Sequence, residues 1–392
     1  MKNQTKIIIA CLFLTPLMCL GLDLYTPSLP AITNYFHVTA LSAKLTIVFY
    51  LVGFAIAQPF VGIIADHIER KSMILIALII YCASSILSAF SPTIHVLYYF
   101  RIINSICAAC TSASIRIMIA ENFSGKMLAK MNNYYVMGWS LTPILAPVLG
   151  GYLQHYFDWQ ASFYFMGLYA FIALVSCAYL LNKKLPSPKT ETVLKKTINT
   201  WKKLFCDRLY IANVIILSVE NSLLFLYYAT APFIIQTILH FDAAQYGKIV
   251  LFIGVSYMTG SFLNGKLLNY FSTQKLIGAG LIASLVVAFA FVCSVLFFHW
   301  NAHPNIYAAT IPIFIIFMLD GFVFANAISQ IVERYTTVAG TASGLMSGLL
   351  NIAAAIVVFL CSALLNLHYL LVLSAVYFVL LFCSICVFRF LK

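Results

Sequence analysis

Long runs of apolar residues cover nearly the whole chain, and this feature restricts the fold more than any other. Each run has roughly the 20 residues that an α-helix needs to cross a bilayer. The runs are apolar on every face, whereas strands of a membrane barrel alternate with a period of two. Because backbone polar groups in lipid must pair internally, such runs form helices. We therefore expect an all-α polytopic membrane protein.

The composition supports this conclusion over the full length. Of the 392 residues, 63% are hydrophobic and only 9% are charged, whereas soluble folds carry about 25% charged residues. A soluble globular domain is thereby excluded. The apolar run that begins at Ile7 is longer than a signal-peptide core, so we expect it to remain as the first span.

Charged, polar and proline-containing segments mark the ends of twelve expected spans. The first six lie at 6–28, 43–64, 73–90, 94–119, 131–154 and 160–181. The second six lie at 209–236, 247–269, 275–298, 306–329, 339–364 and 368–390. Between them is the longest polar stretch, which predicts an N-terminal half at 1–181, a basic linker at 182–208 and a C-terminal half at 209–392.

Positive charge is unevenly divided between the two sides of the predicted membrane. With the N-terminus inside, 19 of the 23 Lys and Arg residues fall in cytoplasmic segments, and only Lys44 and Lys248 fall outside. This bias follows the positive-inside rule, so we expect a bacterial inner-membrane protein with both termini in the cytoplasm. The linker has the pattern of a basic amphipathic helix near 191–205, which faces anionic lipid and not nucleic acid.

The two halves contain related segments. Residues 25–30 in the first span resemble residues 227–232 in the seventh, and Gly62 at the end of span two resembles Gly265 at the end of span eight. Two six-helix halves joined by a cytoplasmic linker form the parallel-repeat architecture of membrane carriers. The repeat therefore predicts a carrier that binds substrate near the midplane, between its halves.

The loop after span two carries the charges expected of a cytoplasmic gate. Asp66, Arg70 and Lys71 can bond neighbouring helix ends, and Gly62 allows helices to approach closely. The segment 62–71 resembles the loop signature of the major facilitator superfamily, which implies a fold of 12 transmembrane helices in two pseudo-symmetric halves. The corresponding segment of the second half has lost the acid and the arginine, which predicts a lock on one side only.

Span five combines two prolines with two glycines. Pro143 and Pro147 kink one face of the helix, and Gly150 and Gly151 permit tight packing. The pattern resembles the proline–glycine signature of proton-coupled drug exporters, with Ala146 in place of the usual glycine.

Two further segments narrow this resemblance. Residues 22–30, and residues 339–343 with Asn326 upstream, resemble the span 1 and span 10–11 segments of the Bcr/CflA drug-exporter subfamily. The resemblance covers nearly the whole chain. It implies proton-coupled export of small molecules by alternating access, driven by the proton gradient and without a cofactor.

Asp23 and Arg101 are ionisable residues within predicted spans, where an unpaired charge costs at least a few kcal/mol. Asp23 lies 17 residues beyond Lys6, roughly 26 Å along a helix, and Arg101 lies six residues beyond His95, roughly 9 Å from the outer side. Both residues therefore lie in the outer part of a hydrocarbon core about 30 Å thick, so we expect them to form an ion pair. Protonation of Asp23 would release Arg101, so the two form the candidate proton-coupling element, with a purely structural ion pair as the alternative.

Other polar and aromatic residues at similar depths are candidates for a substrate cavity. Glu220 and Asp320 are acids within spans seven and ten. We expect them to recognise substrate or to form a second proton site, and the alternative is that they pair with polar groups of a neighbouring helix. The complete predicted cavity set is Tyr25, Asn104, Ser105, Trp139, Glu220, Tyr227, Tyr228, Asp320 and Phe324.

The leading interpretation is a proton-driven antiporter that exports amphipathic small molecules or drugs. We expect a monomer in membrane lipid, with substrate and protons as its other partners. The alternative is a metabolite or siderophore carrier, exporter or importer, of the same fold. We expect neither an enzyme nor a metal site, because the C-x-x-C pairs Cys107–Cys110 and Cys383–Cys386 lack further ligands in their helices.

Overall fold

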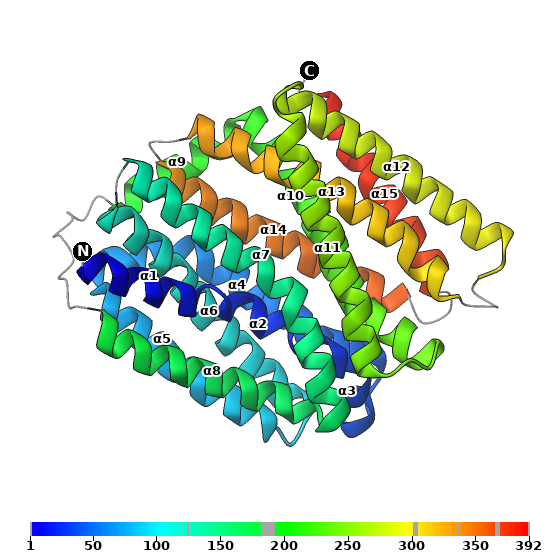
Figure 1. Cartoon of the computed structure of the whole chain (residues 1–392), viewed down its shortest axis with the longest axis horizontal. Coiled ribbons are helices and arrows are strands. Elements are labelled where there is room, and N and C mark those ends of the chain that lie inside the picture. Colours follow the sequence, from blue (N-terminus) through cyan, green and yellow to red (C-terminus); the bar gives the residue numbers. More distant parts are fainter. Residues whose placement is uncertain are drawn as a thin grey trace. The chain divides into compact units, whose positions relative to one another are not determined.

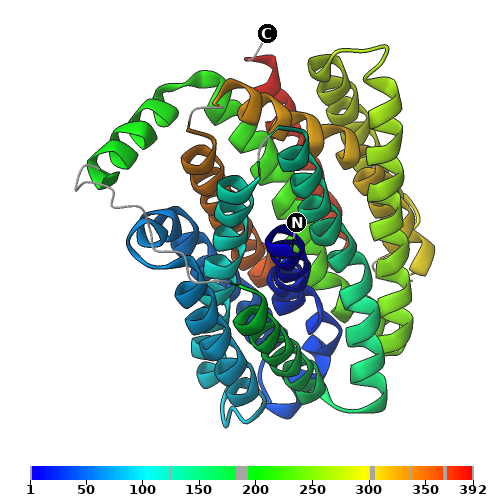
Figure 2. The same cartoon turned by 60° about the vertical axis from the view of Figure 1, so that its left-hand side comes forward.

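The computed structural model consists almost entirely of α-helices in the part of the chain that it describes (Figures 1 and 2). It describes residues 2–123, 125–181, 193–300, 305–335, 338–364 and 369–390. Contacts between helices divide the chain into two compact units, Met1–Asn199 and Thr200–Lys392.

The N-terminal unit contains the predicted first six spans. Its elements are α1 (Lys2–Leu14), α2 (Leu17–Asp23), the 3-10 turn η1 (Thr26–Ser28), α3 (Leu29–Tyr35), α4 (Ala40–His67), α5 (Arg70–Ala89), α6 (Ile94–Asn122), α7 (Gly125–Tyr156) and α8 (Trp159–Leu180). The helix α9 (Val193–Cys206) follows in the predicted linker, where the sequence indicates an amphipathic helix.

The C-terminal unit contains the second six. Its elements are α10 (Arg208–Pro232), the π-helical turn η2 (Phe233–Ile238), α11 (Ala243–Leu267), α12 (Thr273–Phe297), α13 (Ile306–Arg334), α14 (Ala339–Leu364) and α15 (Tyr369–Arg389).

Eleven helical stretches of the described residues are long and apolar enough to cross a membrane. The twelfth is α7, a helix of 32 residues at the predicted fifth span, of which several side chains lie outside the described residues. The predicted fold class is therefore confirmed. The first span is longer than the predicted 6–28, because the chain continues through η1 and α3 and extends the apolar stretch from Lys6 to Tyr35.

The same pattern of helix pairing occurs in both units. In the N-terminal unit α6 packs against α4 and α5, α5 packs against α8, and α2 packs against α7. In the C-terminal unit α13 packs against α11 and α12, α12 packs against α15, and α10 packs against α14. Each contact of the first set has its counterpart six spans later, so the internal repeat predicted from short segments extends to the packing of whole helices.

Glycines allow the closest of these crossings. A Cβ atom on Gly53 of α4 would overlap Ser105 of α6, and a Cβ atom on Gly260 of α11 would overlap the Met318 carbonyl of α13. Both glycines thus let two backbones approach more closely than any other residue permits, and they do so at corresponding helix pairs.

Proline interrupts the first span of each unit. Pro16 separates α1 from α2, and Pro27 lies in the turn η1 that separates α2 from α3. In the C-terminal unit Pro232 is the last residue of α10, and the chain continues in the π-helical turn η2. Because proline has no N–H to donate, these positions end regular helical hydrogen bonding within the bilayer-spanning stretch.

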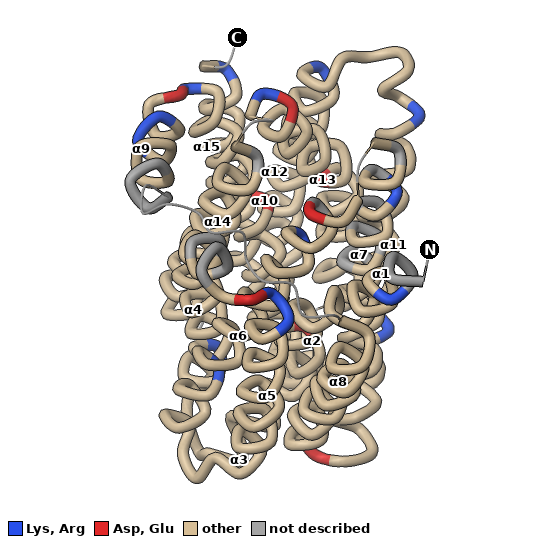
Figure 3. The backbone as a smooth tube through the Cα atoms, turned by 90° about the vertical axis from the view of Figure 1, so that its left-hand side faces the viewer, with Lys and Arg blue, Asp and Glu red and all other residues tan. Residues whose placement is uncertain are grey.

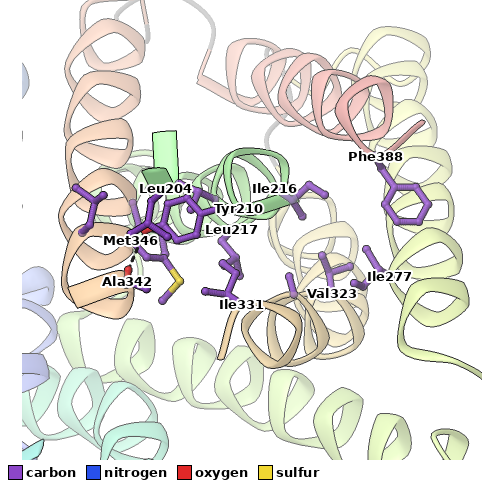
Figure 4. Packing of buried hydrophobic residues seen from close by; sticks show 14 of the residues in the cluster. Leu204, Tyr210, Ile216, Leu217, Ile277, Val323, Ile331, Ala342, Met346 and Phe388 are labelled. Carbon is purple, nitrogen blue, oxygen red and sulfur yellow. Dashed lines mark hydrogen bonds between the residues drawn. The ribbon is translucent and has the colours of Figure 1, made fainter. Parts of the chain in front are cut away.

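A buried apolar cluster joins several helices of the C-terminal unit (Figure 4). Leu217 of α10, Val323 of α13 and Met346 of α14 contribute to it, and the Tyr210 hydroxyl donates a hydrogen bond of 2.8 Å to the Ala342 carbonyl. Leu204 of α9 is also buried here. The linker helix therefore packs against this cluster through Leu204 and the partly buried Trp201.

Charged residues lie mainly near helix ends, and most of each helix is uncharged (Figure 3). Many large apolar side chains, such as Phe252, Ile282 and Phe382, are exposed on the outside of their units. An exposed apolar surface of this kind is what a lipid environment requires.

Candidate functional site

Asp23 lies at the end of α2, where the first span is interrupted. Its side chain is buried, with 3% exposure. The Thr26 hydroxyl donates a hydrogen bond of 2.9 Å to the Asp23 carbonyl, and Pro27 follows in the turn. The acid is therefore the last residue of a short helix, at a point where the backbone changes direction and its carbonyl is held by a side chain.

Arg101 of α6 is completely buried beside this turn. One guanidinium nitrogen, Nη2, donates a hydrogen bond of 2.5 Å to the Gly21 carbonyl of α2. The guanidinium carbon lies 4.1 Å from the centre of the Tyr25 ring and 4.4 Å from that of the Tyr50 ring. Two tyrosine rings and one carbonyl thus hold the buried cation, and Nε and Nη1 have no hydrogen-bond partner among the described residues.

The predicted ion pair between Asp23 and Arg101 is not formed. No ion pair within 4.0 Å joins these two described residues. The reason is that the Tyr25 and Tyr50 rings occupy the guanidinium faces and the Gly21 carbonyl accepts its bond. The two charges nevertheless share one neighbourhood, because both act electrostatically on Tyr25 and on Tyr50.

Hydrogen bonds with residues of α2 and α4 orient the tyrosines of this neighbourhood. The Tyr25 hydroxyl lies 2.9 Å from the Thr46 hydroxyl of α4, and the Tyr50 hydroxyl donates to the Met18 carbonyl of α2 at 2.9 Å. Because each ring is tied to a neighbouring element, a shift of α2 relative to α4 would alter the surroundings of Arg101. The Asp23–Arg101 neighbourhood, meaning Asp23, Arg101, Tyr25 and Tyr50, is the candidate proton-coupling site.

Asn104 and Ser105, two polar residues of α6, are buried between helices. The Ser84 hydroxyl donates to the Asn104 side-chain oxygen, and the Ser105 hydroxyl donates to the Ile102 carbonyl at 2.8 Å. Asn104 and Ser105 are both completely buried. In this conformation these two predicted cavity residues therefore contribute to the packing between helices.

The proline–glycine segment of α7 packs directly against the turn that follows Asp23. A Cβ atom on Gly150 would overlap the Leu24 carbonyl. Pro147 and Gly151 are buried, and Pro143 is partly exposed. The segment therefore supports the backbone next to Asp23, and substitution of Gly150 would displace it. The side chain of Trp139, a predicted cavity residue on the same helix, lies outside the described residues.

The predicted gate residues at the start of α5 bond to neighbouring helices. Arg70 forms an ion pair of 3.1 Å with Glu121 at the end of α6, and Lys71 donates a hydrogen bond of 2.8 Å to the Ala178 carbonyl of α8. The side chains of Gly62 and Asp66 lie outside the described residues. Sequence reasoning did not identify Glu121, although an acid at the end of the helix that carries Arg101 is a signal in so acid-poor a chain.

The C-terminal unit has its own ion pair near a helix end. Arg334 at the end of α13 lies 3.0 Å from Asp207, which precedes α10 and also caps it by accepting from the Leu209 N–H. Burial alone raises the pKa of the Asp207 carboxyl, but the Tyr335 hydroxyl, the Leu209 N–H and Arg334 stabilise the carboxylate, so the pKa lies below its usual range. The second half therefore has an ion pair near its helix ends, although the segment that corresponds to residues 62–71 has lost its acid and its arginine.

The remaining predicted cavity residues lie inside the C-terminal unit. Glu220 and Tyr227 of α10 and Asp320 of α13 are buried, as is Tyr228. The Tyr227 ring packs against Phe317 with centroids 6.2 Å apart. Phe324 packs against the apolar cluster of this unit, where it contributes to the core.

A small pocket lies elsewhere in the N-terminal unit. Its lining includes Cys11, Thr15 and Tyr135, and the Tyr135 hydroxyl lies 3.2 Å from that of Ser112. Among the described residues no group of three or more His, Cys, Asp or Glu side chains is placed to hold a metal ion.

Comparison with known proteins adds information on ancestry. The family model described as Major Facilitator Superfamily matches residues 11–358. The multidrug resistance protein MdtL of Shewanella sp. (strain ANA-3) is 24% identical over 272 residues, which cover 69% of this chain and 68% of that protein. The chloramphenicol resistance protein CraA of Acinetobacter baumannii is 27% identical over 291 residues, which cover 72% of this chain and 68% of that protein.

Among solved structures, the D-xylose–proton symporter aligns with a TM-score of 0.76 at 14% identity, over 97% of both chains. A bacterial homologue of the lysosomal transporter Spinster aligns with a TM-score of 0.75 at 15% identity, over 100% of this chain and 97% of that chain. At such identities these likenesses concern the fold alone.

Proposed function

The chain belongs to the Major Facilitator Superfamily, a superfamily of transporters, and we propose that it is a proton-coupled antiporter that exports amphipathic small molecules. The observation that supports this most is the Asp23–Arg101 neighbourhood. It holds a buried acid and a buried cation without an ion pair between them, at an interruption of the first span. Buried charges in a membrane protein mark ion or substrate pathways.

The proposed coupling uses two arrangements of Asp23. A buried carboxyl without a cation beside it favours its neutral form, whereas a carboxyl next to an arginine favours its charged form. Movement at the α2–η1 turn carries Asp23 towards or away from Arg101, so the acid loads a proton in one arrangement and releases it in the other. The Gly150 contact with Leu24 transmits movement of α7 to this turn.

The proposed substrate class has two lines of support. Relatives that are 24% and 27% identical bear the names of multidrug and chloramphenicol resistance proteins. The proline–glycine segment, which resembles that of drug exporters, packs against the turn next to Asp23. We further propose that the protein works as a monomer in the bacterial inner membrane, with both termini in the cytoplasm, as the distribution of Lys and Arg predicts.

Transport into inverted membrane vesicles tests this function. With an imposed gradient, acid inside, vesicles that contain the protein should accumulate labelled chloramphenicol or ethidium above vesicles that lack it, and a protonophore should abolish the difference. Uptake that ignores the gradient would contradict the proton coupling. Absence of uptake for both probes would favour the alternative, a metabolite or siderophore carrier.

A further inference from the structure

The C-terminal unit buries two acids on adjacent helices. Glu220 of α10 has 2% exposure and Asp320 of α13 has 6%. The proposed coupling at Asp23 uses neither of them. Burial of two carboxyl groups within one helix bundle is costly unless something compensates their charge, so the surroundings of these acids decide what they do.

Contacts between α10 and α13 place the two acids in the same section of the bundle. The Asn213 side chain donates a hydrogen bond of 3.1 Å to Gln330, and the Tyr227 ring packs against Phe317 at 6.2 Å. Both Glu220 and Asp320 lie between these two contacts on their helices. The charge of Asp320 acts on Glu220, as expected of a neighbouring carboxyl group.

Tyrosines are the titratable groups that face this carboxyl pair, meaning Glu220 and Asp320. Tyr257 of α11 and Tyr377 of α15 each interact electrostatically with both acids. The Tyr377 hydroxyl donates to the Leu223 carbonyl at 2.7 Å, and Tyr227 of α10 also acts on Tyr377. The two other helices that pack against α10 and α13, namely α12 and α14, contribute no buried charged side chain.

No buried cation compensates the carboxyl pair within the described helices α10 to α15. The Lys and Arg residues of these helices are all exposed: Arg208, Lys248, Lys266, Lys275, Arg334 and Arg389. This is the difference from the N-terminal unit, in which the completely buried Arg101 shares the neighbourhood of Asp23.

Each acid of the carboxyl pair has a buried oxygen without a partner in the described part of the chain, and so does Tyr227 on α10. Glu220 Oε1, Asp320 Oδ1 and the Tyr227 hydroxyl are buried and have no hydrogen-bond partner among the described residues. One turn away on each helix, Leu217 and Val323 belong to the apolar cluster (Figure 4). A buried carboxylate oxygen that accepts no hydrogen bond is unfavourable, and protonation of the carboxyl group removes its charge.

We propose that Glu220 and Asp320 form a second proton-binding site, in which the two carboxyl groups share a proton at neutral pH. Two adjacent carboxylates in a site of low dielectric cannot both remain charged without a cation, so one of them holds a proton and donates it to the other. Both residues of this site belong to the C-terminal unit, and the proposal does not depend on whether the chain exports drugs.

Infrared spectroscopy on the purified full-length protein tests this site directly. The carbonyl band of protonated carboxyl groups is recorded across a pH titration in the Asp23→Asn background, so that Asp23 contributes nothing. A band should be present at pH 7 and absent from the double variant Glu220→Gln/Asp320→Asn. Each single variant should keep a band, but this band should disappear at a lower pH than in the parent, at a hydroxide concentration at least tenfold lower. The reason is that the remaining carboxyl group no longer faces a second negative charge.

Glu333→Gln is the matched control, since Glu333 is an exposed acid on the same helix as Asp320, and it should leave the titration unchanged. The proposal is overturned if no band is present at pH 7, or if the band persists in the double variant. It is also overturned if both single variants titrate as the parent does, a result that needs no folded double variant. None of these outcomes depends on transport.

Discussion

The two units bury their acids in opposite ways. In the N-terminal unit Asp23 shares its surroundings with Arg101, a completely buried cation held between two tyrosine rings. In the C-terminal unit the titratable groups that interact with Glu220 and Asp320, among the described residues, are the acids themselves and tyrosines, and the Lys and Arg residues of the described helices α10 to α15 are all exposed. The helix pairing is the same in both units, so the difference lies in the side chains.

This difference shows how one helical framework provides two kinds of acidic site. An acid near a cation can gain or lose a proton when a small movement changes the distance between them, because an adjacent cation stabilises the charged form of the acid. An acid beside another acid keeps a proton in every arrangement that excludes cations. The first kind suits exchange during a transport cycle, and the second suits storage of a proton.

Loss of the buried cation should have the largest effect. Arg101→Ala removes the Gly21 hydrogen bond, the contacts with both tyrosine rings and the buried positive charge of the Asp23–Arg101 neighbourhood. Gradient-driven accumulation in vesicles should fall to background. Arg116→Ala is the matched control on the same helix, because Arg116 bonds only to Gln58 at 2.8 Å among the described side chains, and it should keep most of the transport. The reverse ranking of these variants would contradict the comparison.

Alanine substitutions at the close backbone contacts of the two units should affect stability alike but transport differently. Gly150→Ala and Gly260→Ala each place a methyl group against a carbonyl, of Leu24 and of Met318, at a cost of about 1–3 kcal/mol. Both variants should lower the melting temperature in detergent, but at equal protein levels only Gly150→Ala should reduce the rate of proton-driven transport. Gly265→Ala is the control, because nothing lies within 4 Å of its added Cβ atom, and its melting temperature should not fall. An equal loss of transport in both close-contact variants would remove the distinction.

The ion pair of Asp207 and Arg334 should have the smallest effect, because Arg334 is half exposed and solvent screens the pair. Asp207→Asn should reduce stability at pH 7 by about 1 kcal/mol or less. The pKa of the folded Asp207 lies below its usual value, so its contribution is complete above about pH 5 and is lost as the pH falls below about 4. Melting temperatures of both proteins across this range provide the test. A difference that grows on acidification would have the wrong sign.

The fold was predictable because it depends on features that are local in the sequence. Span length, the positive charge of the loops and the segments at 25–30 and 227–232 suffice for twelve helices in two related halves. The predicted end of the first span at residue 28 was wrong, because α3 extends the apolar stretch to Tyr35.

The site was less predictable, since it depends on the direction of side chains as well as on depth. Depth along the helix correctly brought Asp23 and Arg101 into one neighbourhood, but it carries no information on which group the guanidinium contacts. Tyr50, which covers one face of Arg101, is an ordinary aromatic residue in the sequence. Glu121 and Asp207 were missed for a related reason, since their partners Arg70 and Arg334 lie far away in the chain.

The central claim, that Asp23 exchanges a proton for substrate, is tested most directly by proton release from the purified protein. On addition of a transported drug in weakly buffered detergent solution, the wild-type protein should release protons and Asp23→Asn should release none, while Glu220→Gln should still release them. The Asn side chain still forms hydrogen bonds, so drug binding to this variant, measured separately, should persist. Release of the wild-type number of protons by Asp23→Asn would contradict the account and move coupling to Glu220 and Asp320.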